Sequence, residues 1–226
     1  MITLFVAADG LSSEEGETRN ILWGLVGAGL QFGIKVNLDY ILQHGYARAF
    51  SDLRVYDRQL FVDLKMWNGK RTMVDVAKAM VGHEVDFFNI YALADSEIPP
   101  VIEVTRGTKT KVLAVTVLTH YDDAYCQRHF QRSLWEAVRH FGETAVELGC
   151  DGIILPGTVL DAVAHLDTVK VVPGVRPLWY KDTRHSEEIE PSVAKKKGAD
   201  IVVCGSPIMK SDDPAAAMKR ILQELQ

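Results

Sequence analysis

The chain has few cysteines, no excess of basic residues and no long apolar run. Its 226 residues include only Cys126, Cys150 and Cys204, which lie far apart and form no CxxC pair. This argues against a disulfide framework and against a zinc ribbon, so Cys150 and Cys204 are expected to be buried apolar residues. The formal net charge is −5. A chain of this charge has no general attraction to nucleic acid or acidic membranes, and we expect neither as a partner.

Signals for export and membrane insertion are also missing from the pattern. The first ten residues, MITLFVAADG, contain a short apolar segment without a basic region or a small-residue cleavage site. No later segment approaches the ~20 apolar residues of a membrane-spanning helix. The sequence therefore predicts a cytoplasmic protein.

What the chain does contain is an eightfold alternation of short apolar runs and longer segments with helical spacing. The runs, rich in β-branched residues, lie at 2–8, 32–37, 60–65, 86–91, 111–117, 151–156, 169–174 and 200–205. The helical segments lie at 16–30, 38–49, 70–83, 95–107, 131–149, 158–166, 191–198 and 212–225. Apolar strands that alternate with helices are typical of a parallel sheet. Eight such units predict one α/β domain over 1–226, a single (β/α)8 TIM barrel.

Polar residues gather where the predicted strands end, which is where barrel enzymes bind substrates. Asp9 follows the first strand, Lys35 lies in the second, and Asp63 and Lys65 end the third. A buried ammonium is costly unless an acid pairs with it, so we expect both lysines to pair with Asp63. A lysine held among charges in a cleft is typical of a proton donor. An ion-pair network that only plugs the barrel mouth is the alternative, and Asp9 could instead cap a helix.

The turns after the last two strands carry a second signal. Pro173-Gly174 follows the seventh strand and Gly205-Ser206 follows the eighth. Such turns place backbone N–H groups at helix starts, where a barrel usually binds phosphate. We therefore expect a phosphorylated small molecule as the substrate.

Three further side chains are candidates for substrate binding. Thr119 follows the fifth strand, and Arg176 and Arg184 lie in the long segment 175–190. A loop of this length in a compact barrel is more often a lid over the active site than a connection without function.

Two other patterns predict ordinary structure. The ligand-type residues between 120 and 129 are His120, Asp122, Asp123, Cys126 and His129. Their spacing matches no zinc template, so no metal site is expected there. The glycines of 24–29 lack the GxGxxG spacing of a dinucleotide site, and they indicate close helix packing or a helix end.

Segments along nearly the whole chain resemble the orotidine 5'-phosphate decarboxylase family in their order and spacing. They are Ala8-Asp9, Lys35-Val36, Asp63-Leu64-Lys65, AVTVLT (114–119), GCDGIIL (149–155), VVPGVRP (171–177), GADIVVCGSPI (198–208) and DDPAAAMKRI (212–221). The wider suprafamily includes sugar-phosphate decarboxylases and hexulose-phosphate synthases that use magnesium and carry an acid on the second strand. This chain has Lys35 there, so the resemblance implies the metal-free nucleotide branch, which needs no cofactor.

The resemblance also implies an activity and a role for each residue. The reaction is decarboxylation of orotidine 5'-phosphate to UMP, a step of pyrimidine biosynthesis. Lys65 would protonate C6 of the pyrimidine as carbon dioxide leaves, and Asp63 would crowd the substrate carboxylate and help to hold Lys65. Lys35 would orient Asp63 and bind the ribose, and Asp9 would accept a ribose hydroxyl. The enzyme would be a homodimer whose active sites are shared between subunits.

Two residues depart from the family pattern at important positions. The family has D-x-K-x-x-D on the third strand, and its last acid reaches the neighbouring subunit's site; here that position is Asn68. The family's phosphate-binding arginine after the eighth strand is replaced by Ser206. Backbone N–H groups and Arg176, Arg184 or Lys210 are the candidates to replace it.

A third departure lies in the loop after the seventh strand, where the family's glutamine has no clear counterpart in 179–190. These changes leave two alternatives open. One is a suprafamily enzyme that acts on another phosphorylated substrate, as a sugar-phosphate decarboxylase or an aldolase does. The other is a nucleotide-binding barrel without catalytic activity.

Overall fold

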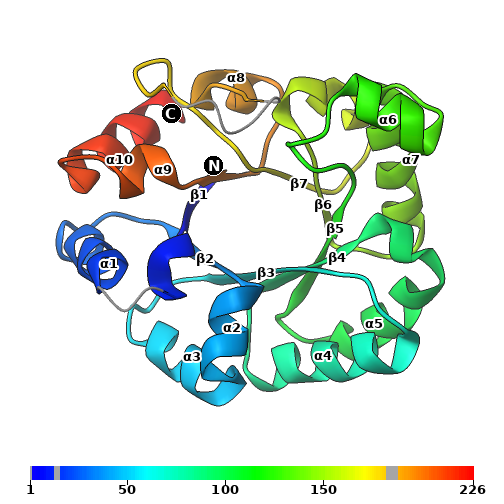
Figure 1. The fold of residues 1–226 in the computed structure, drawn as a ribbon, viewed down its shortest axis with the longest axis horizontal. Helices are drawn as coiled ribbons and strands as arrows, with labels where there is room; N and C mark the ends of the chain where they lie inside the picture. The colour runs from blue at the N-terminus through cyan, green and yellow to red at the C-terminus, as the bar shows by residue number, and fades with distance from the viewer. Residues whose placement is uncertain (1, 13–15, 182–187) are drawn as a thin grey trace.

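Eight parallel strands close into a barrel in the computed structural model, which describes residues 2–12, 16–181 and 188–226 (Figure 1). Each strand pairs with the next along the chain, and the eighth pairs with the first. The strands are β1 (Thr3–Ala7), β2 (Gly33–Asn37), β3 (Leu60–Met66), β4 (Phe87–Tyr91), β5 (Lys111–Val115), β6 (Gly152–Ile154), β7 (Val169–Val172) and β8 (Ile201–Cys204). All eight predicted strands and the predicted TIM barrel are confirmed.

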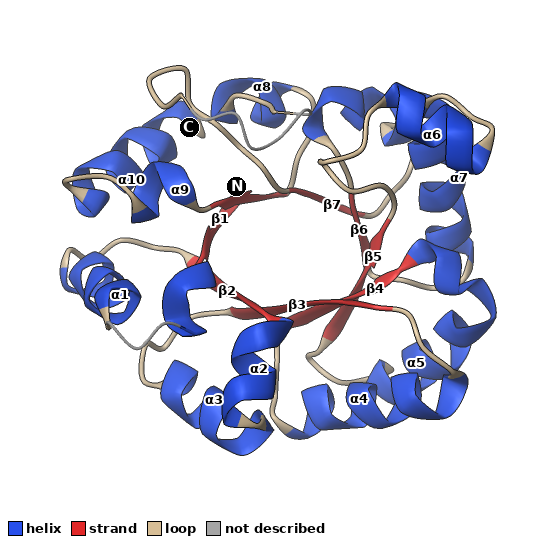
Figure 2. Cartoon of the chain, viewed as in Figure 1, coloured by secondary structure: helices blue, strands red, loops and turns tan. Residues whose placement is uncertain are grey.

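Helices surround the barrel on its outer side (Figure 2). The α-helices are α1 (Glu17–Gly27), α2 (Leu38–His44), α3 (Tyr46–Arg54), α4 (Lys70–Gly82), α5 (Ile98–Thr105), α6 (Asp123–Phe130), α7 (Leu134–Glu147), α8 (Pro191–Lys196), α9 (Ser206–Met209) and α10 (Pro214–Glu224). Three 3-10 segments, η1 (Asp9–Ser12), η2 (Ala92–Glu97) and η3 (Gly157–Val163), follow β1, β4 and β6. Within the described residues, no helix is both long and apolar enough to cross a membrane.

The helical layer differs from the prediction at four places. The predicted helix at 38–49 is two helices, because Gly45 has a positive φ of 73° between α2 and α3. The predicted helix at 158–166 is the 3-10 segment η3, which contains a non-helical residue, Val159. The short helices α6 and α9 were not predicted, because one or two turns give too little apolar periodicity to detect.

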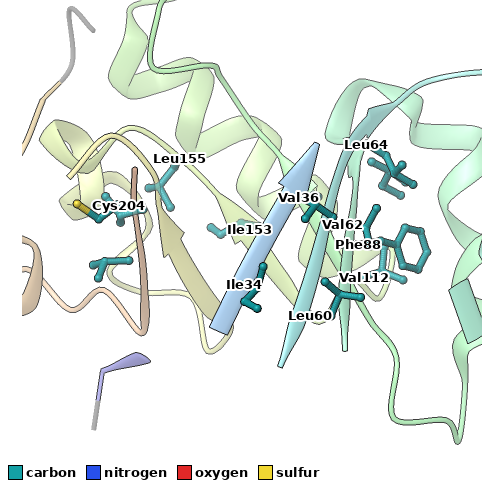
Figure 3. Close-up of a cluster of buried hydrophobic side chains, with 14 of the residues drawn as sticks. Ile34, Val36, Leu60, Val62, Leu64, Phe88, Val112, Ile153, Leu155 and Cys204 are labelled. Carbon is teal, nitrogen blue, oxygen red and sulfur yellow. The ribbon is translucent and has the colours of Figure 1, made fainter. Parts of the chain in front are cut away.

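The core has two layers because side chains alternate between the two faces of each strand. Outward-facing residues such as Ile34, Val36 and Val62 pack in the apolar layer beneath the helices (Figure 3). Inward-facing residues of a second cluster, including Phe5 and Phe61, fill the barrel interior. The same alternation turns residues 35, 63 and 65 toward the interior, at the carboxyl ends of their strands.

Cys150 and Cys204 belong to the packed interior, as predicted, and so does Cys126. All three are buried. Burial raises the pKa of the Cys150 and Cys204 thiols to about 12, so neither is a reactive thiolate near neutral pH.

Candidate active site

A pocket of about 280 Å³ opens at the carboxyl ends of the strands. Its floor is apolar and comes from the inner layer of the core, with Phe61 and Val115 among its residues. Its walls contain nine of the predicted site residues: Asp9, Lys35, Asp63, Lys65, Thr119, Pro173, Arg176, Gly205 and Ser206. The tertiary structure therefore brings together residues that lie almost 200 positions apart in the sequence.

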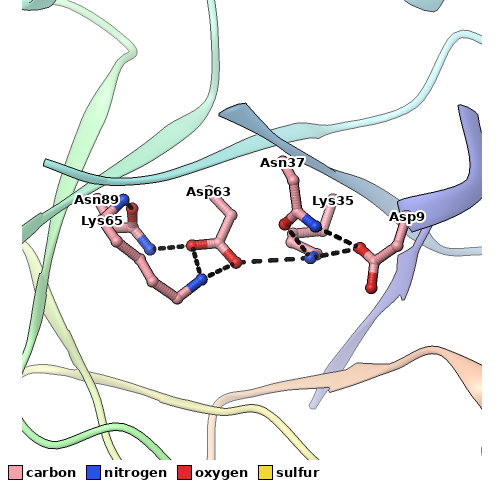
Figure 4. Close-up of polar contacts among 6 residues, drawn as sticks. All are labelled: Asp9, Lys35, Asn37, Asp63, Lys65 and Asn89. Atoms are coloured by element: carbon pink, nitrogen blue, oxygen red, sulfur yellow. Dashed lines mark hydrogen bonds and ion pairs between the residues drawn. The ribbon is translucent and has the colours of Figure 1, made fainter. Parts of the chain in front are cut away.

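Four charged side chains from β2, β3 and the segment after β1 form a row of alternating sign along one wall (Figure 4). In order they are Asp9, Lys35, Asp63 and Lys65. The Lys35 Nζ atom lies 2.7 Å from Asp9 Oδ1 and 3.5 Å from Asp63 Oδ2. The Lys65 Nζ atom lies 2.7 Å from Asp63 Oδ1 and 2.6 Å from its Oδ2. The predicted pairing of both lysines with Asp63 is confirmed, and Asp9 supplies a second acid.

Lys35 is only 6% exposed, and its contacts within the row offset the cost of burying its charge. Its ammonium donates to Asp9, to Asn37 Oδ1 at 2.6 Å and to Asp63, which uses all three of its N–H groups. Two ammonium groups face two carboxylates, so the row carries no net charge. This balance removes most of the cost of placing the charges in a cleft.

Asp63 stays ionised although it is largely buried. Burial by itself raises the pKa of this carboxyl, but the charges of Lys35 and Lys65 act in the opposite direction. Hydrogen bonds from Lys65 and Asn89 lower the pKa further, and the net result is a value below the ordinary one. Lys65 thus faces a full negative charge at neutral pH, while its own side chain remains 40% exposed toward the pocket.

Two asparagines contact the row, and no role was predicted for either, although both were recognised as polar residues near strand ends. Asn37 donates to Asp9 Oδ1 at 3.1 Å and accepts from Lys35. Asn89, the middle residue of β4, donates from Nδ2 to Asp63 Oδ1 at 2.7 Å. Both asparagines face inward near the carboxyl ends of their strands, and a polar residue at such a position is the sequence signal for a site residue.

The opposite side of the pocket is formed by the turns after β7 and β8. Gly174, Gly205 and Ser206 line it together with Arg176. The Arg176 residue is only 6% exposed, its Nε atom lies 3.5 Å from Glu188 Oε1, and its guanidinium lies over the Tyr180 ring. A positive group is therefore present at the predicted phosphate wall, but it already has an acidic neighbour.

The predicted lid is described only at its two ends. Val175 forms a β-bridge with Ile189, and the Arg176 N–H donates to the Ile189 carbonyl at 2.9 Å. These contacts hold the two ends together beside the pocket. Arg184 lies outside the described residues, so its predicted role and that of the lid stay predictions.

Asn68 does not line the pocket of its own chain. It lies in the loop between β3 and α4, is exposed, and its Oδ1 accepts from the Gly69 N–H at 2.8 Å. The neighbouring Trp67 is 58% exposed. A role for Asn68 in catalysis would therefore require a second subunit.

The ligand-type residues near position 120 serve mainly local structure. Asp122 caps α6 by accepting from the Tyr125 N–H, and Asp123 accepts from the Leu134 N–H. Cys126 is buried, and His120 lines the pocket. Across residues 2–12, 16–181 and 188–226, no cluster of three or more His, Cys, Asp or Glu side chains is placed to hold a metal ion.

Comparison with known sequences gives a consistent result. The model of the "Orotidine 5'-phosphate decarboxylase / HUMPS family" matches residues 4–221. The chain is 27% identical over 229 residues to an orotidine 5'-phosphate decarboxylase of Nautilia profundicola, a match that covers 99% of this chain and 98% of the relative. It is 32% identical over 207 residues to one of Paramagnetospirillum magneticum, which covers 85% and 87% of the two chains.

Solved structures show the same fold. The crystal structure of orotidine 5'-phosphate decarboxylase from Lactobacillus acidophilus superposes with a TM-score of 0.82 at 26% identity, over 100% of both chains. An uncharacterized conserved protein from Geobacillus kaustophilus superposes with a TM-score of 0.79 at 23% identity, over 99% of this chain and 100% of the other.

Proposed function

The chain belongs to the orotidine 5'-phosphate decarboxylase / HUMPS family, and on this premise we propose that it decarboxylates orotidine 5'-phosphate to UMP without a metal or cofactor. The observation that supports the proposal best is the row of alternating charges, which ends at Lys65. This row holds one ammonium toward the pocket beside an ionised carboxylate. Such an arrangement suits a reaction in which negative charge develops on carbon.

In the proposed reaction Lys65 is the proton donor. When the substrate loses carbon dioxide, the electron pair of the broken bond remains on C6 of the pyrimidine. An ammonium already in place stabilises that charge without reorganisation of solvent, and its proton forms the new C–H bond. Asp63 lies within 2.7 Å of the ammonium and would repel the substrate carboxylate until it leaves.

The rest of the substrate would extend across the barrel from β3 toward β7 and β8. Asp9, just after β1, and Lys35, in β2, line the pocket and would bind the ribose hydroxyls. The apolar floor would contact the base. Gly205, Ser206 and Arg176 would bind the phosphate, with Thr119 contributing a hydroxyl from the loop after β5.

We propose that the working unit is a homodimer. Leu38 and Leu42 on α2, and Trp67 after β3, are 40%, 74% and 58% exposed, and they follow the carboxyl ends of the neighbouring strands β2 and β3. Exposed apolar side chains on neighbouring elements are typical of an interaction surface. A second copy on this face would cover them and bring its Asn68 toward the pocket.

Turnover tests the proposed function. Purified protein mixed with orotidine 5'-phosphate is expected to form UMP. The reaction is monitored by the loss of the substrate's absorbance. Lys65→Ala is expected to lower the rate by about 10³-fold, as for removal of a general acid. Lys111→Ala is the matched control, because Lys111 is also a strand lysine paired with an aspartate, at 3.0 Å, but lies far from the pocket. Native protein without turnover would exclude this function.

A second candidate function is favoured by Ser206 and Asn68, which stand where the family pattern has an arginine and an acid. A family enzyme with these changes could act on another phosphorylated substrate. Pentulose and hexulose phosphates, assayed with and without magnesium, test this candidate. Tight UMP binding by calorimetry together with no reaction on any of these substrates would instead indicate a non-catalytic nucleotide-binding barrel.

A further inference from the structure

The pairing of β3 with β4 is irregular at Lys65, the proton donor of the proposed function. Val62 pairs with Phe88 and Met66 pairs with Ile90, so three residues of β3 face the single residue Asn89 of β4. Within this bulge Lys65 has a φ of 46°. Residues other than glycine rarely adopt this left-handed conformation unless the surrounding structure holds them in it.

The Asn89 side chain occupies the gap that the bulge leaves in the ladder. Its Oδ1 accepts from the Lys65 backbone N–H at 2.6 Å, and its Nδ2 donates to Asp63 Oδ1 at 2.7 Å. The residue is 1% exposed. A backbone N–H left without a partner in the protein interior is costly, so the amide oxygen stabilises the unusual conformation of Lys65.

The chemistry of the two contacts requires an amide at this position. One neighbour, the Lys65 N–H, is a donor, and the other, the Asp63 carboxylate, is an acceptor. An amide offers an acceptor at one end and a donor at the other, which also settles the orientation of the Asn89 side chain. A carboxylate of the same shape would accept from Lys65 but would repel Asp63, and an alanine would satisfy neither group.

We propose that Asn89 is the positioning residue of the active site, which holds the Lys65 backbone in its left-handed conformation and orients the Asp63 carboxylate toward the Lys65 ammonium. It acts through these two residues and does not itself transfer a proton. The hydrogen bond from Asn89 is also one of the causes that lower the pKa of Asp63. The expected effect of Asn89 on turnover rests on the proposed function, whereas its expected effect on the pKa of Asp63 does not.

The first experiment needs no substrate. The carboxyl of Asp63 is titrated by carbon-13 NMR in protein labelled at aspartate, and its signal is assigned by its absence from Asp63→Asn. In Asn89→Ala the pKa of Asp63 is expected to rise relative to the native protein. In Asn89→Asp two carboxyls share one site. One of the two apparent pKa values is therefore expected to rise well above the ordinary pKa of an aspartate.

Thr116→Val is the matched control. Thr116 is also buried near a strand end, and its Oγ1 donates to the Ile154 carbonyl at 2.9 Å, so this variant also loses one buried side-chain hydrogen bond. It touches neither Asp63 nor Lys65 and is expected to leave the titration unchanged. If Asn89→Ala does not fold, the isosteric Asn89→Asp provides the test.

The second experiment measures turnover of orotidine 5'-phosphate. Asn89→Ala is expected to lower kcat by about 10²-fold with a smaller change in KM, since a misplaced catalytic group affects the chemical step most. An Asp63 titration identical to the native one in both Asn89 variants, or a kcat equal to that of Thr116→Val, would overturn the proposal. Native protein without turnover would refute the proposed function alone, because the titration still tests Asn89.

Discussion

The charged residues of the pocket stabilise one another through ion pairs between three separate segments of the sequence. The third strand supplies one acid and one base, Asp63 and Lys65, and the second strand adds Lys35. Asp9, from the end of β1, makes the numbers of acids and bases equal by pairing with Lys35 at 2.7 Å. Removing any one of these groups leaves the row with an unbalanced, partly buried charge.

The pH dependence of stability tests this balance. The folded pKa of Asp63 is below its ordinary value of 3.8, so its ionised form stabilises the fold at any pH above that value. The contribution is lost as the pH falls through the folded pKa. Asp63→Asn is expected to lower the free energy of unfolding by about 3 kcal/mol at pH 7, and the difference from the native protein should narrow in acid.

Urea unfolding at a series of pH values measures this difference. Asp75→Asn is the control, because Asp75 lies in exposed ion pairs on α4 and its loss is expected to cost less than about 1 kcal/mol at pH 7. An Asp63→Asn protein as stable as the native one at pH 7 would show that the row contributes little to folding.

Restoring a carboxylate at Asn68 tests the role of this position in the proposed reaction. In the proposed homodimer, Asn68→Asp would add a second acid near the active site of the partner subunit. We expect orotidine 5'-phosphate turnover to rise by about 10²-fold, the scale of one electrostatic group. Asn20→Asp, which adds the same charge on exposed α1, should leave the rate unchanged. A rate that does not respond to Asn68→Asp would place Asn68 outside the reaction.

At the scale of secondary-structure elements, the barrel depends on close contacts between its shortest strands. β6 has only three residues, and it pairs with β7 through Gly152 opposite Val169. A Cβ atom on Gly152 would lie 2.7 Å from the Val169 carbonyl oxygen. Because that atom belongs to the backbone, the strand itself would have to move to make room.

Gly152→Ala is therefore expected to destabilise the protein by about 1–3 kcal/mol, the range found for overpacked interiors. Gly24→Ala is the matched substitution, since Gly24 lies inside α1 and a Cβ there would meet nothing within 4 Å. Alanine in a helix interior is expected to stabilise by about 0.5–1 kcal/mol. Thermal unfolding of the two variants should shift in opposite directions, and equal shifts would contradict the close approach at β6.

For the molecule as a whole, the surface that contains Leu38, Leu42 and Trp67 is expected to form the interface of the proposed homodimer. Leu42→Glu places a charge on this face and should convert the dimer to a monomer, as measured by sedimentation equilibrium. Leu178→Glu is the matched control, because Leu178 is 75% exposed, like Leu42 at 74%, but lies in the loop after β7. Dissociation by Leu178→Glu, or a native monomer, would contradict the proposed face.

Much of the architecture and part of the site were predictable from local sequence. Strands buried on both faces have continuous apolar runs, and eight such runs separated by helical segments predict the closed barrel. Asp63 and Lys65 were predictable because charged residues at the end of a buried strand are costly without a partner. The roles of Asn37 and Asn89 were not, since an asparagine at a strand end is equally common in turns and helix caps.

The sequence alone determined the order of strands and helices, the position of the polar strand ends and the family resemblance, because each depends on residues close together in the chain. Only the tertiary structure decided which of those residues meet. Pairing of β1 with β2 brings Asp9 to Lys35, and the bulge in β3 brings Lys65 to Asn89. These contacts depend on strand register and on backbone conformation, which arise from packing across the whole barrel and are not encoded in any short segment.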